Sequence, residues 1–234
     1  MLIQTTFAEA IDRRHSVRRF TDRKIEGPEL EELEKCVADC NSEGNLRIRL
    51  MLNEPEAFRS RLAHYGSFRN VKNYLVLAGK AAGDLDERLG YYGERLVILA
   101  DALGLNSCWV GLTYSKGRIP LELAPGEKAV LVIALGYGET KGVPHKSKSF
   151  EQVVKGNGPF PEWFRNGVAA ALKAPTAMNQ QNFRFELAGE RSVRAVRGFF
   201  LTARGFGAFD KVDLGIAKFH FEIGAGAGNF KWAD

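Results

Sequence analysis

Four residues near the N-terminus, Arg14, His15, Ser16 and Arg18, have the side chains that a phosphate-binding segment needs. Two guanidinium groups and a hydroxyl would form charge-assisted hydrogen bonds to phosphate oxygens, each contributing about 1.5–3 kcal/mol. If the chain is extended after a first helix ends, positions 14, 16 and 18 project to the same side. In a continuing helix, Ser16 would face elsewhere, and the segment would be an ordinary basic helix end that complements the dipole. Spacing alone favours this second interpretation.

A second polar segment lies far along the chain, at residues 173–183. Pro175 cannot continue a helix, and it pushes Ala174 toward an extended conformation. Thr176 offers a hydroxyl, and Asn179 offers an amide that both donates and accepts. This combination suits the polar edge and ribityl chain of a flavin. It is equally typical of a helix-to-strand loop in which Asn and Gln cap backbone groups, and the residues alone leave both interpretations open.

The elements that must position these segments follow from capping and periodicity. Thr6 and Glu9 have the spacing of a capping box, which predicts a short helix that ends near Arg14. Pro28 begins a second helix, and Gly104 ends a long one. Helices and strands alternate without a strict βαβ period, which favours a mixed α+β fold. The predicted helices are 28–41, 84–103, 161–172 and 213–221, and the predicted strands are 46–50, 71–77, 129–135 and 183–187.

Composition restricts the class of protein. A chain of 234 residues fits one large domain or two small interlocked ones, and 45% hydrophobic residues exclude a disordered chain. The net charge of +5 suits an anionic small ligand, but the positive residues are scattered among 28 acidic ones. We therefore expect no nucleic-acid partner. No apolar run has the length of a membrane span or a signal peptide, so we expect no membrane association and a cytoplasmic protein.

Cysteine and histidine patterns indicate neither a metal site nor a nucleophile. Cys36 and Cys40 would share one face of a helix as buried small side chains, and with Cys108 they make an odd count. No further Cys or His pair has the spacing of additional metal ligands. His145 and His220 match no arrangement with a nucleophile, so each is expected to be a surface or satisfied polar residue.

Taken together, the two polar segments resemble those of the FMN-dependent nitroreductase family. Residues 173–183 are similar to its Ala-Pro-Ser-x-x-Asn-x-Gln-Pro-Trp signature, and residues 13–20 to its Arg-x-Ser-x-Arg-x-Phe segment. The resemblance implies that residues 173–183 border the flavin ring and that residues 13–20 hold the FMN phosphate. The implied phosphate ligands are Arg14, His15, Ser16 and Arg18, and the implied ring contacts are Pro175, Thr176, Ala177, Asn179 and Gln181.

Two further stretches resemble the same family. Residues 92–111 are similar to its central helix and the following Leu-Gly-Leu-x-Ser-Cys-Trp-x-Gly segment, which implies that the Gly111 backbone lies by the reactive ring nitrogen. Residues 135–154 resemble its closing strand and basic phosphate-binding tail. Lys146 and Lys148 would then be further phosphate contacts, and a solvated basic loop is the alternative for them.

The order of the segments differs from that in ordinary family members. The two polar segments lie on opposite sides of the tail, as in a subgroup in which one chain carries two shortened tandem halves. We expect a nitroreductase-like α+β fold with mainly antiparallel sheets flanked by helices, and an intrachain pseudo-dimer with halves at 1–150 and 151–234 that form one compact unit. Residues 41–45 replace the second copy of the polar loop, so we expect one composite flavin site.

The resemblance implies an FMN-dependent enzyme that transfers hydride from NAD(P)H through the flavin to a nitroaromatic, a quinone or a similar small-molecule acceptor. The flavin would carry the chemistry, so no catalytic side chain is expected. The chain would be a monomer with internal pseudo-symmetry or a homodimer. One alternative is a flavin-binding, flavin-sequestering or flavin-fragmenting protein without NAD(P)H turnover, and another is a basic interaction module without a cofactor.

Overall fold

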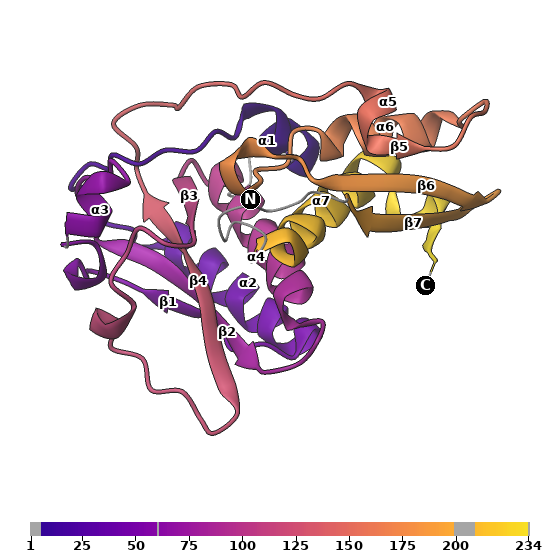
Figure 1. Cartoon of the computed structure of the whole chain (residues 1–234). Coiled ribbons are helices and arrows are strands. Elements are labelled where there is room, and N and C mark those ends of the chain that lie inside the picture. Colours follow the sequence, from indigo (N-terminus) through magenta and orange to yellow (C-terminus); the bar gives the residue numbers. More distant parts are fainter. Residues whose placement is uncertain (1–5, 60, 199–208, 234) are drawn as a thin grey trace.

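Two four-stranded sheets make up the β structure of the computed structural model, which describes residues 6–59, 61–198 and 209–233 (Figure 1). The first sheet has the strand order β1-β2-β4-β3, and all its neighbours are antiparallel. In the second sheet, of order β5-β6-β7-β8, only the central pair is antiparallel. Each sheet lies within one of the two predicted halves. The strands are β1 (Arg49–Met51), β2 (Asn73–Lys80), β3 (Asn106–Val110), β4 (Glu127–Gly136), β5 (Val154–Lys155), β6 (Phe183–Gly189), β7 (Ser192–Arg197) and β8 (Lys231–Trp232).

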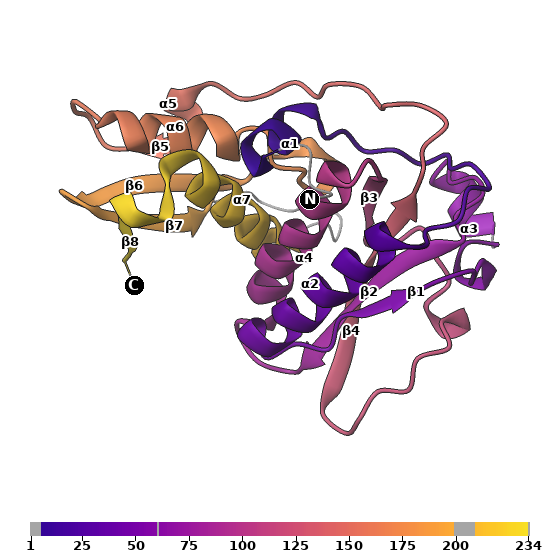
Figure 2. The same cartoon turned by 180° about the vertical axis from the view of Figure 1, so that it is seen from behind.

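Two long helices lie between the sheets. Helix α4 packs on β2, β3 and β4, helix α7 packs on β6 and β7, and the two helices pack on each other (Figures 1 and 2). Helix α2 covers α4 and β1, and helix α6 covers α7. No helix in the described ranges is both long and apolar enough to cross a membrane. The helices are α1 (Phe7–Arg13), α2 (Pro28–Gly44), α3 (Arg61–Tyr65), α4 (Leu85–Ala102), α5 (Phe150–Val153), α6 (Glu162–Ala171) and α7 (Asp210–Ala225).

The ends of the first predicted helix are confirmed. Thr6 and Glu9 form the capping box, with the Glu9 amide 3.3 Å from the Thr6 hydroxyl and the Thr6 amide 2.7 Å from the Glu9 carboxylate. Arg13 is the last helical residue, and Arg14 is extended with φ −63° and ψ 126°. The extended conformation after the helix, on which the phosphate-segment interpretation depended, is therefore present.

One predicted strand is shorter than expected, and four strands, β3, β5, β7 and β8, were not predicted. In the 46–50 region, the strand starts only at Arg49, although the Arg47 amide already donates to the Ala78 carbonyl of β2 at 2.8 Å. The Asn41 side chain bonds the amide (2.6 Å) and the carbonyl (2.9 Å) of Ile48, whose backbone groups face away from β2. Strands β3 and β7 lack a long alternation of apolar and polar residues. Each is held in its sheet by backbone pairing, β3 with β4 and β7 with β6.

Two glycines let α4 and α7 cross at backbone contact. A Cβ atom on Gly90 would lie 2.1 Å from the Val212 carbonyl oxygen, and one on Gly215 would lie 2.0 Å from the Glu87 carbonyl oxygen. The spacing from Glu87 to Gly90 equals that from Val212 to Gly215. Each helix thus presents the same two positions to the other, which is the pattern of contacts about a two-fold axis.

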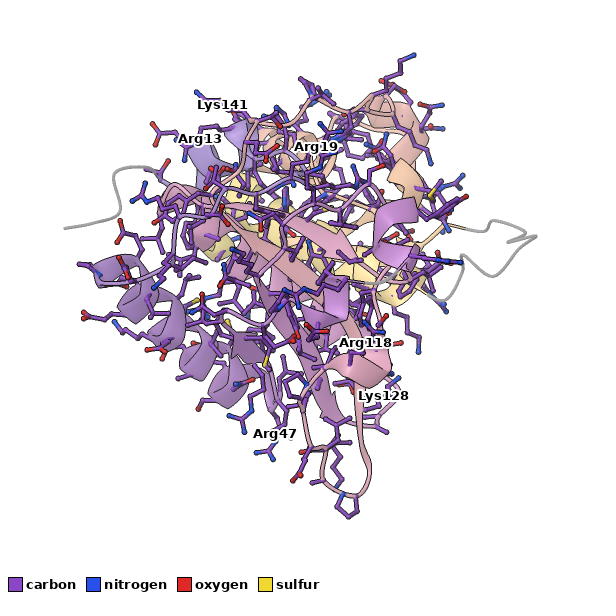
Figure 3. All side chains as sticks on the ribbon, turned by 90° about the vertical axis from the view of Figure 1, so that its left-hand side faces the viewer. Arg13, Arg19, Arg47, Arg118, Lys128 and Lys141 are labelled. Carbon is purple, nitrogen blue, oxygen red and sulfur yellow. The ribbon has the colours of Figure 1, made fainter. Side chains whose placement is uncertain are left out.

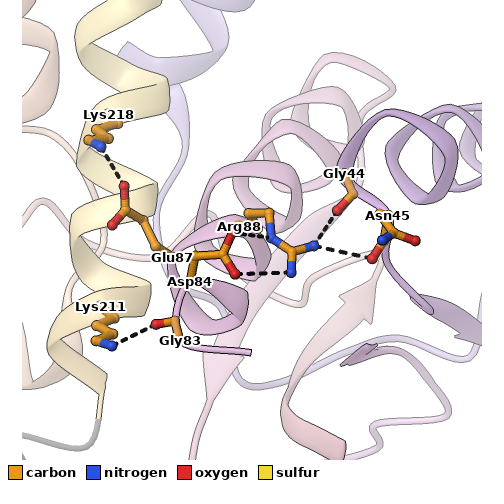
Figure 4. A network of polar contacts seen from close by, with 8 residues as sticks. All are labelled: Gly44, Asn45, Gly83, Asp84, Glu87, Arg88, Lys211 and Lys218. Carbon is orange, nitrogen blue, oxygen red and sulfur yellow. Dashed lines mark hydrogen bonds and ion pairs between the residues drawn. The ribbon is translucent and has the colours of Figure 1, made fainter. Parts of the chain in front are cut away.

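Polar contacts at the start of α4 tie three helices together (Figure 4). Lys218 of α7 pairs with Glu87, and the Lys211 ammonium donates to the Gly83 carbonyl at 2.7 Å. On the other side, Arg88 donates to the Asn45 carbonyl, directly after α2, at 3.2 Å. These contacts hold α2 and α7 on opposite sides of α4.

The paired buried cysteines were predicted correctly. Cys36 and Cys40 are both buried on α2, with their sulfur atoms 3.9 Å apart, and Cys108 is buried in β3. All three are free thiols that fill the core.

We predict that Gly215→Ala destabilises the protein by about 1–3 kcal/mol or more, because its Cβ cannot fit against the Glu87 carbonyl without moving a helix. Urea unfolding measures the effect. Gly117→Ala is the control, since a Cβ there meets no atom within 4 Å. Equal stability of the two variants would show that the crossing is not tightly constrained.

Candidate active site

The N-terminal segment (residues 14–18) lies along strand β3. Ser16 forms a parallel bridge with Ser107, and the Val17 amide donates to the Ser107 carbonyl at 3.0 Å. Ser16 is half-buried and Arg18 is exposed. Because β3 ends one residue before Gly111, this bridge fixes the segment relative to Gly111.

Arg14 does not share the open side of Ser16 and Arg18. Its side chain is 4% exposed, and its Nε atom lies 4.0 Å from a carboxylate oxygen of Glu94 on α4. That Nε atom is buried and has no hydrogen-bond partner among the described residues. The expectation that positions 14, 16 and 18 project together is therefore wrong for this structure, because the buried carboxylate draws the Arg14 guanidinium inward.

Glu94 is the centre of a buried polar network. Its carboxylate accepts a hydrogen bond from Trp109 Nε1 at 2.8 Å, and His220 Nε2 lies 2.8 Å from its other oxygen. The other ring nitrogen of His220 lies 3.1 Å from the Ala170 carbonyl. His220 is thus a satisfied buried residue, as predicted. Its partner Glu94 was missed, because 126 positions separate the two in the sequence and no local spacing signals the pair.

The basic tail segment (residues 145–148) is bonded to the polar loop (residues 172–181) through one carbonyl group. The Leu172 carbonyl accepts from His145 Nε2 at 3.1 Å, from the Ser147 hydroxyl at 3.1 Å and from Gln181 Nε2 at 3.2 Å. This carbonyl follows directly after α6, where helical partners are lacking. The C-terminal end of the helix therefore joins the two segments.

Further bonds join the same two segments. The Lys148 amide donates to the Gln181 side-chain oxygen at 2.7 Å, and the Lys148 ammonium donates to the Gln181 carbonyl at 3.0 Å. Burial and the neighbouring Arg184 charge lower the pKa of Lys148. The Asn179 amide nitrogen donates to the Lys146 carbonyl at 2.8 Å. The structure thus brings Lys146, Lys148, Asn179 and Gln181 together, as a composite site requires.

The polar loop has an unusual backbone. Met178, Asn179 and Gln181 have φ values of 52°, 55° and 47°, in the left-handed region that disfavours non-glycine residues. The Thr176 hydroxyl accepts from the Gln181 amide at 3.0 Å and closes the turn. Such strain persists only where surrounding contacts maintain it, and it is concentrated at functional sites.

The loop residues divide by exposure. Gln181 is 1% exposed and its amide group bonds within the site, as the backbone-capping interpretation predicted. Asn179 is exposed and Thr176 is half-buried, so both are accessible to a ligand. A direct ligand contact from Gln181 stays a prediction.

Gly111 and the polar loop meet the same end of helix α7. A Cβ atom on Gly111 would lie 2.4 Å from the Phe209 ring, so this ring packs directly on the Gly111 backbone. One turn further on, both carboxylate oxygens of Asp213 lie 3.0 Å from the Ala177 amide. Sequence reasoning missed Asp213, whose position in the first turn of a helix is common for an acidic residue.

His15 links the N-terminal segment to the tail. A Cβ atom on Gly142, which has a φ of +75°, would lie 2.7 Å from His15 Cβ. Burial and the charges of Arg14 and His145 lower the pKa of His15, so its imidazole is neutral at pH 7. A neutral ring can still donate one hydrogen bond to a phosphate.

A pocket of about 720 Å³ opens beside His15. Its lining has charges of both signs, including Arg13, Asp101 and Lys141, but no residue of the polar loop. We therefore locate the candidate site by the convergence of the segments and not by this pocket. The described part of the chain has no cluster of side chains suited to hold a metal ion.

Comparison with known proteins identifies a family. The family model described as Putative TM nitroreductase matches residues 6–225. A putative nitroreductase from Thermotoga maritima is 21% identical, with a TM-score of 0.63 over 94% of this chain and 83% of that one. A putative nitroreductase from Desulfovibrio desulfuricans, solved in complex with FMN, is 19% identical, with a TM-score of 0.53 over 68% of this chain and 99% of that one.

A putative NADH dehydrogenase/NAD(P)H nitroreductase from Parabacteroides distasonis is 19% identical, with a TM-score of 0.52 over 66% of this chain and 99% of that one. No curated protein matches the chain. The structural likeness confirms the predicted α+β nitroreductase fold.

We predict that Glu94→Gln lowers the free energy of unfolding by about 3–5 kcal/mol, because it leaves the buried Arg14 without its counter-charge. Denaturant unfolding measures the loss. Glu43→Gln is the control. It breaks a surface pair between Glu43 of α2 and Arg95, which follows Glu94 on α4, and it should change stability by less than about 1 kcal/mol. Similar losses in both variants would contradict a special role for the buried carboxylate.

Proposed function

The chain belongs to the Putative TM nitroreductase family, and we propose from this that it is an FMN-dependent oxidoreductase. It would transfer hydride from NAD(P)H to a nitroaromatic, a quinone or a similar small acceptor. The observation that carries the proposal is the convergence of segments from both ends of the chain. The tail and the polar loop share five hydrogen bonds of 2.7–3.1 Å, and His15 of the N-terminal segment lies against Gly142, just before the tail.

The described residues fit a bound FMN. Arg14 Nε is a buried donor without an acceptor among these residues, and the N-terminal segment and the tail add the half-buried Ser16 and the exposed Arg18 and Lys146. Unpaired donors and positive charge favour a dianionic phosphate. Asn179 and Thr176 supply exposed polar groups for the ring and its ribityl chain.

In this proposal the protein binds and orients, and bound flavin supplies the two-electron chemistry between the nicotinamide and the acceptor. Ser16, Arg18 and Lys146 hold the phosphate, and Arg14, whose charge is paired with Glu94, offers its free Nε–H group. Asn179 orients the ring edge, and the Gly111 backbone donates toward it. Met178 in the polar loop is 74% exposed.

We also propose that the two halves, 1–150 and 151–234, are a tandem duplication with one surviving flavin site. The reciprocal glycine contacts of α4 and α7 support the duplication. In the first half, Asn41 uses its side chain to hold Ile48, and Asn45 is the left-handed end of α2. No proline loop comparable to 172–181 follows that helix.

The arrangement of basic residues supports a small anionic ligand over nucleic acid. Arg13, Arg19 and Lys141 lie at one end of the molecular side shown in Figure 3, and Arg47, Arg118 and Lys128 at the other. Carboxylates pair with four of these six: Asp101, Glu127, Glu56 and Asp86 contact Arg13, Arg47, Arg118 and Lys128. Paired charges attract a polyanion weakly.

The first test is the visible absorption spectrum of the purified protein, with mass identification of the compound that heat releases. We predict a yellow protein with about one FMN per chain, because only one composite site is complete. Oxidation of NAD(P)H with a quinone acceptor then tests turnover. A yellow protein without turnover would indicate a flavin-binding protein, and a colourless one that does not bind added FMN would overturn the proposal.

We predict that Arg18→Ala weakens FMN binding about tenfold or more, because it removes a charge-assisted bond to the phosphate. Titration of the apoprotein with FMN measures the affinity. The control is Arg19→Ala, which removes the same charge from a neighbouring exposed position. Arg14→Ala combined with Arg18→Ala should lose FMN during purification, and full occupancy of that double variant would count against the assignment.

A further inference from the structure

Asp213 is a buried carboxylate with too few partners. It lies in the first turn of α7 and is 4% exposed. Both of its oxygens lie 3.0 Å from the Ala177 amide, its one hydrogen-bond donor among the described residues. A carboxylate has about four acceptor positions, so most of this capacity is unused. Burying a charge is unfavourable unless the charge is paired and hydrogen-bonded.

No cationic side chain in the described ranges pairs with Asp213. Burial raises its pKa to about 7; the Ala177 amide opposes this shift, and Asp210 in the same turn adds to it. Charged groups on the neighbouring helices have other partners. Glu87 of α4 pairs with Lys218 of α7, and Lys173, two residues after α6, pairs with Asp12 of α1. Among the described residues, Asp213 is therefore held by one backbone amide alone.

The amide that Asp213 holds is at the start of the strained turn. Ala177 is the first residue of the 3₁₀ turn Ala177–Asn179, and the next two residues have positive φ. The Thr176 hydroxyl and the Asn179 side chain anchor the far side of this turn. Asp213 is its anchor on the side of α7.

We propose that Asp213 is a positioning residue for the polar loop. Its carboxylate fixes the Ala177 amide, and its ionisation determines how firmly the turn at residues 176–179 is held against a bound flavin. The inference rests on the proposed function for its effect on flavin. The anchoring of the turn is a property of the protein without any ligand.

The direction of the pH effect follows from the chemistry of the bond. An ionised carboxylate accepts a stronger hydrogen bond than a neutral acid, so the turn is held most firmly above about pH 7. The stability of the folded protein changes with pH in the opposite direction. Because folding raises the pKa, the contribution of Asp213 to stability is fully present below its unfolded pKa of about 3.9 and is lost as the pH rises through about 7.

Hydrogen exchange of the Ala177 amide tests the anchoring without flavin. In the full-length apoprotein at pH 8, we predict that Asp213→Ala lowers the protection factor of this amide about tenfold or more. In the wild type, protection should increase between pH 6 and pH 8, and in Asp213→Asn it should be independent of pH. Asp210→Asn is the matched control, since it removes a nearby charge but no bond to Ala177.

FMN titration of the same proteins tests the consequence for the site. The wild type should bind FMN more tightly at pH 8 than at pH 6, and Asp213→Asn should lose this dependence. Unchanged Ala177 protection in Asp213→Ala would overturn the proposal, whatever the result with FMN. If Asp213→Ala does not fold, equal pH dependence of protection in the wild type and Asp213→Asn overturns it. If protection responds as predicted but no variant binds FMN, the proposed function fails and the anchoring stands.

Discussion

The crossing of α4 and α7 is the constraint on which the rest of the structure depends. Gly90 and Gly215 remove the side chains that would separate the helices, and their backbones touch. This close approach places Glu94 of one helix 2.8 Å from His220 of the other, in a core that excludes water. A carboxylate buried in this way requires partners, so Arg14 lies with its guanidinium toward it. One crossing thereby fixes helices from both halves and the end of α1.

Every part of the candidate site is attached to this crossing. The N-terminal segment lies beside β3, and β3 packs on α4. Phe209, at the start of α7, packs on Gly111. The polar loop bonds to α7 through Asp213. In the proposed site, a ligand would therefore contact both halves of the chain. This is the geometric reason to treat the protein as one functional unit.

The polar loop illustrates how binding and folding compete for the same groups. The side chains of Gln181 and Asn179 form hydrogen bonds with the tail, and these bonds help to hold Met178, Asn179 and Gln181 in left-handed conformations. A loop ordered in advance loses less entropy when a ligand binds. The same bonds reduce the number of side chains that can reach the ligand. Gln181 is the clearest example of a loop side chain used for support. The sequence was consistent with either a ligand contact or a supporting residue at this position, and in the structure Gln181 is buried.

The sequence by itself determined the element types, the family resemblance and the chemical character of the two polar segments. These are local properties: a capping box at Thr6, a helix stop at Pro175 and the spacing of arginines from 14 to 18 all involve residues a few positions apart. Only the tertiary structure decided which side chains face a ligand. Arg14 turned inward and Asp213 became a loop anchor because of Glu94 and Ala177, which are distant in the sequence and adjacent only after the helices cross. Local patterns carry no record of such contacts, since the energy of a buried charge depends on partners that folding brings together.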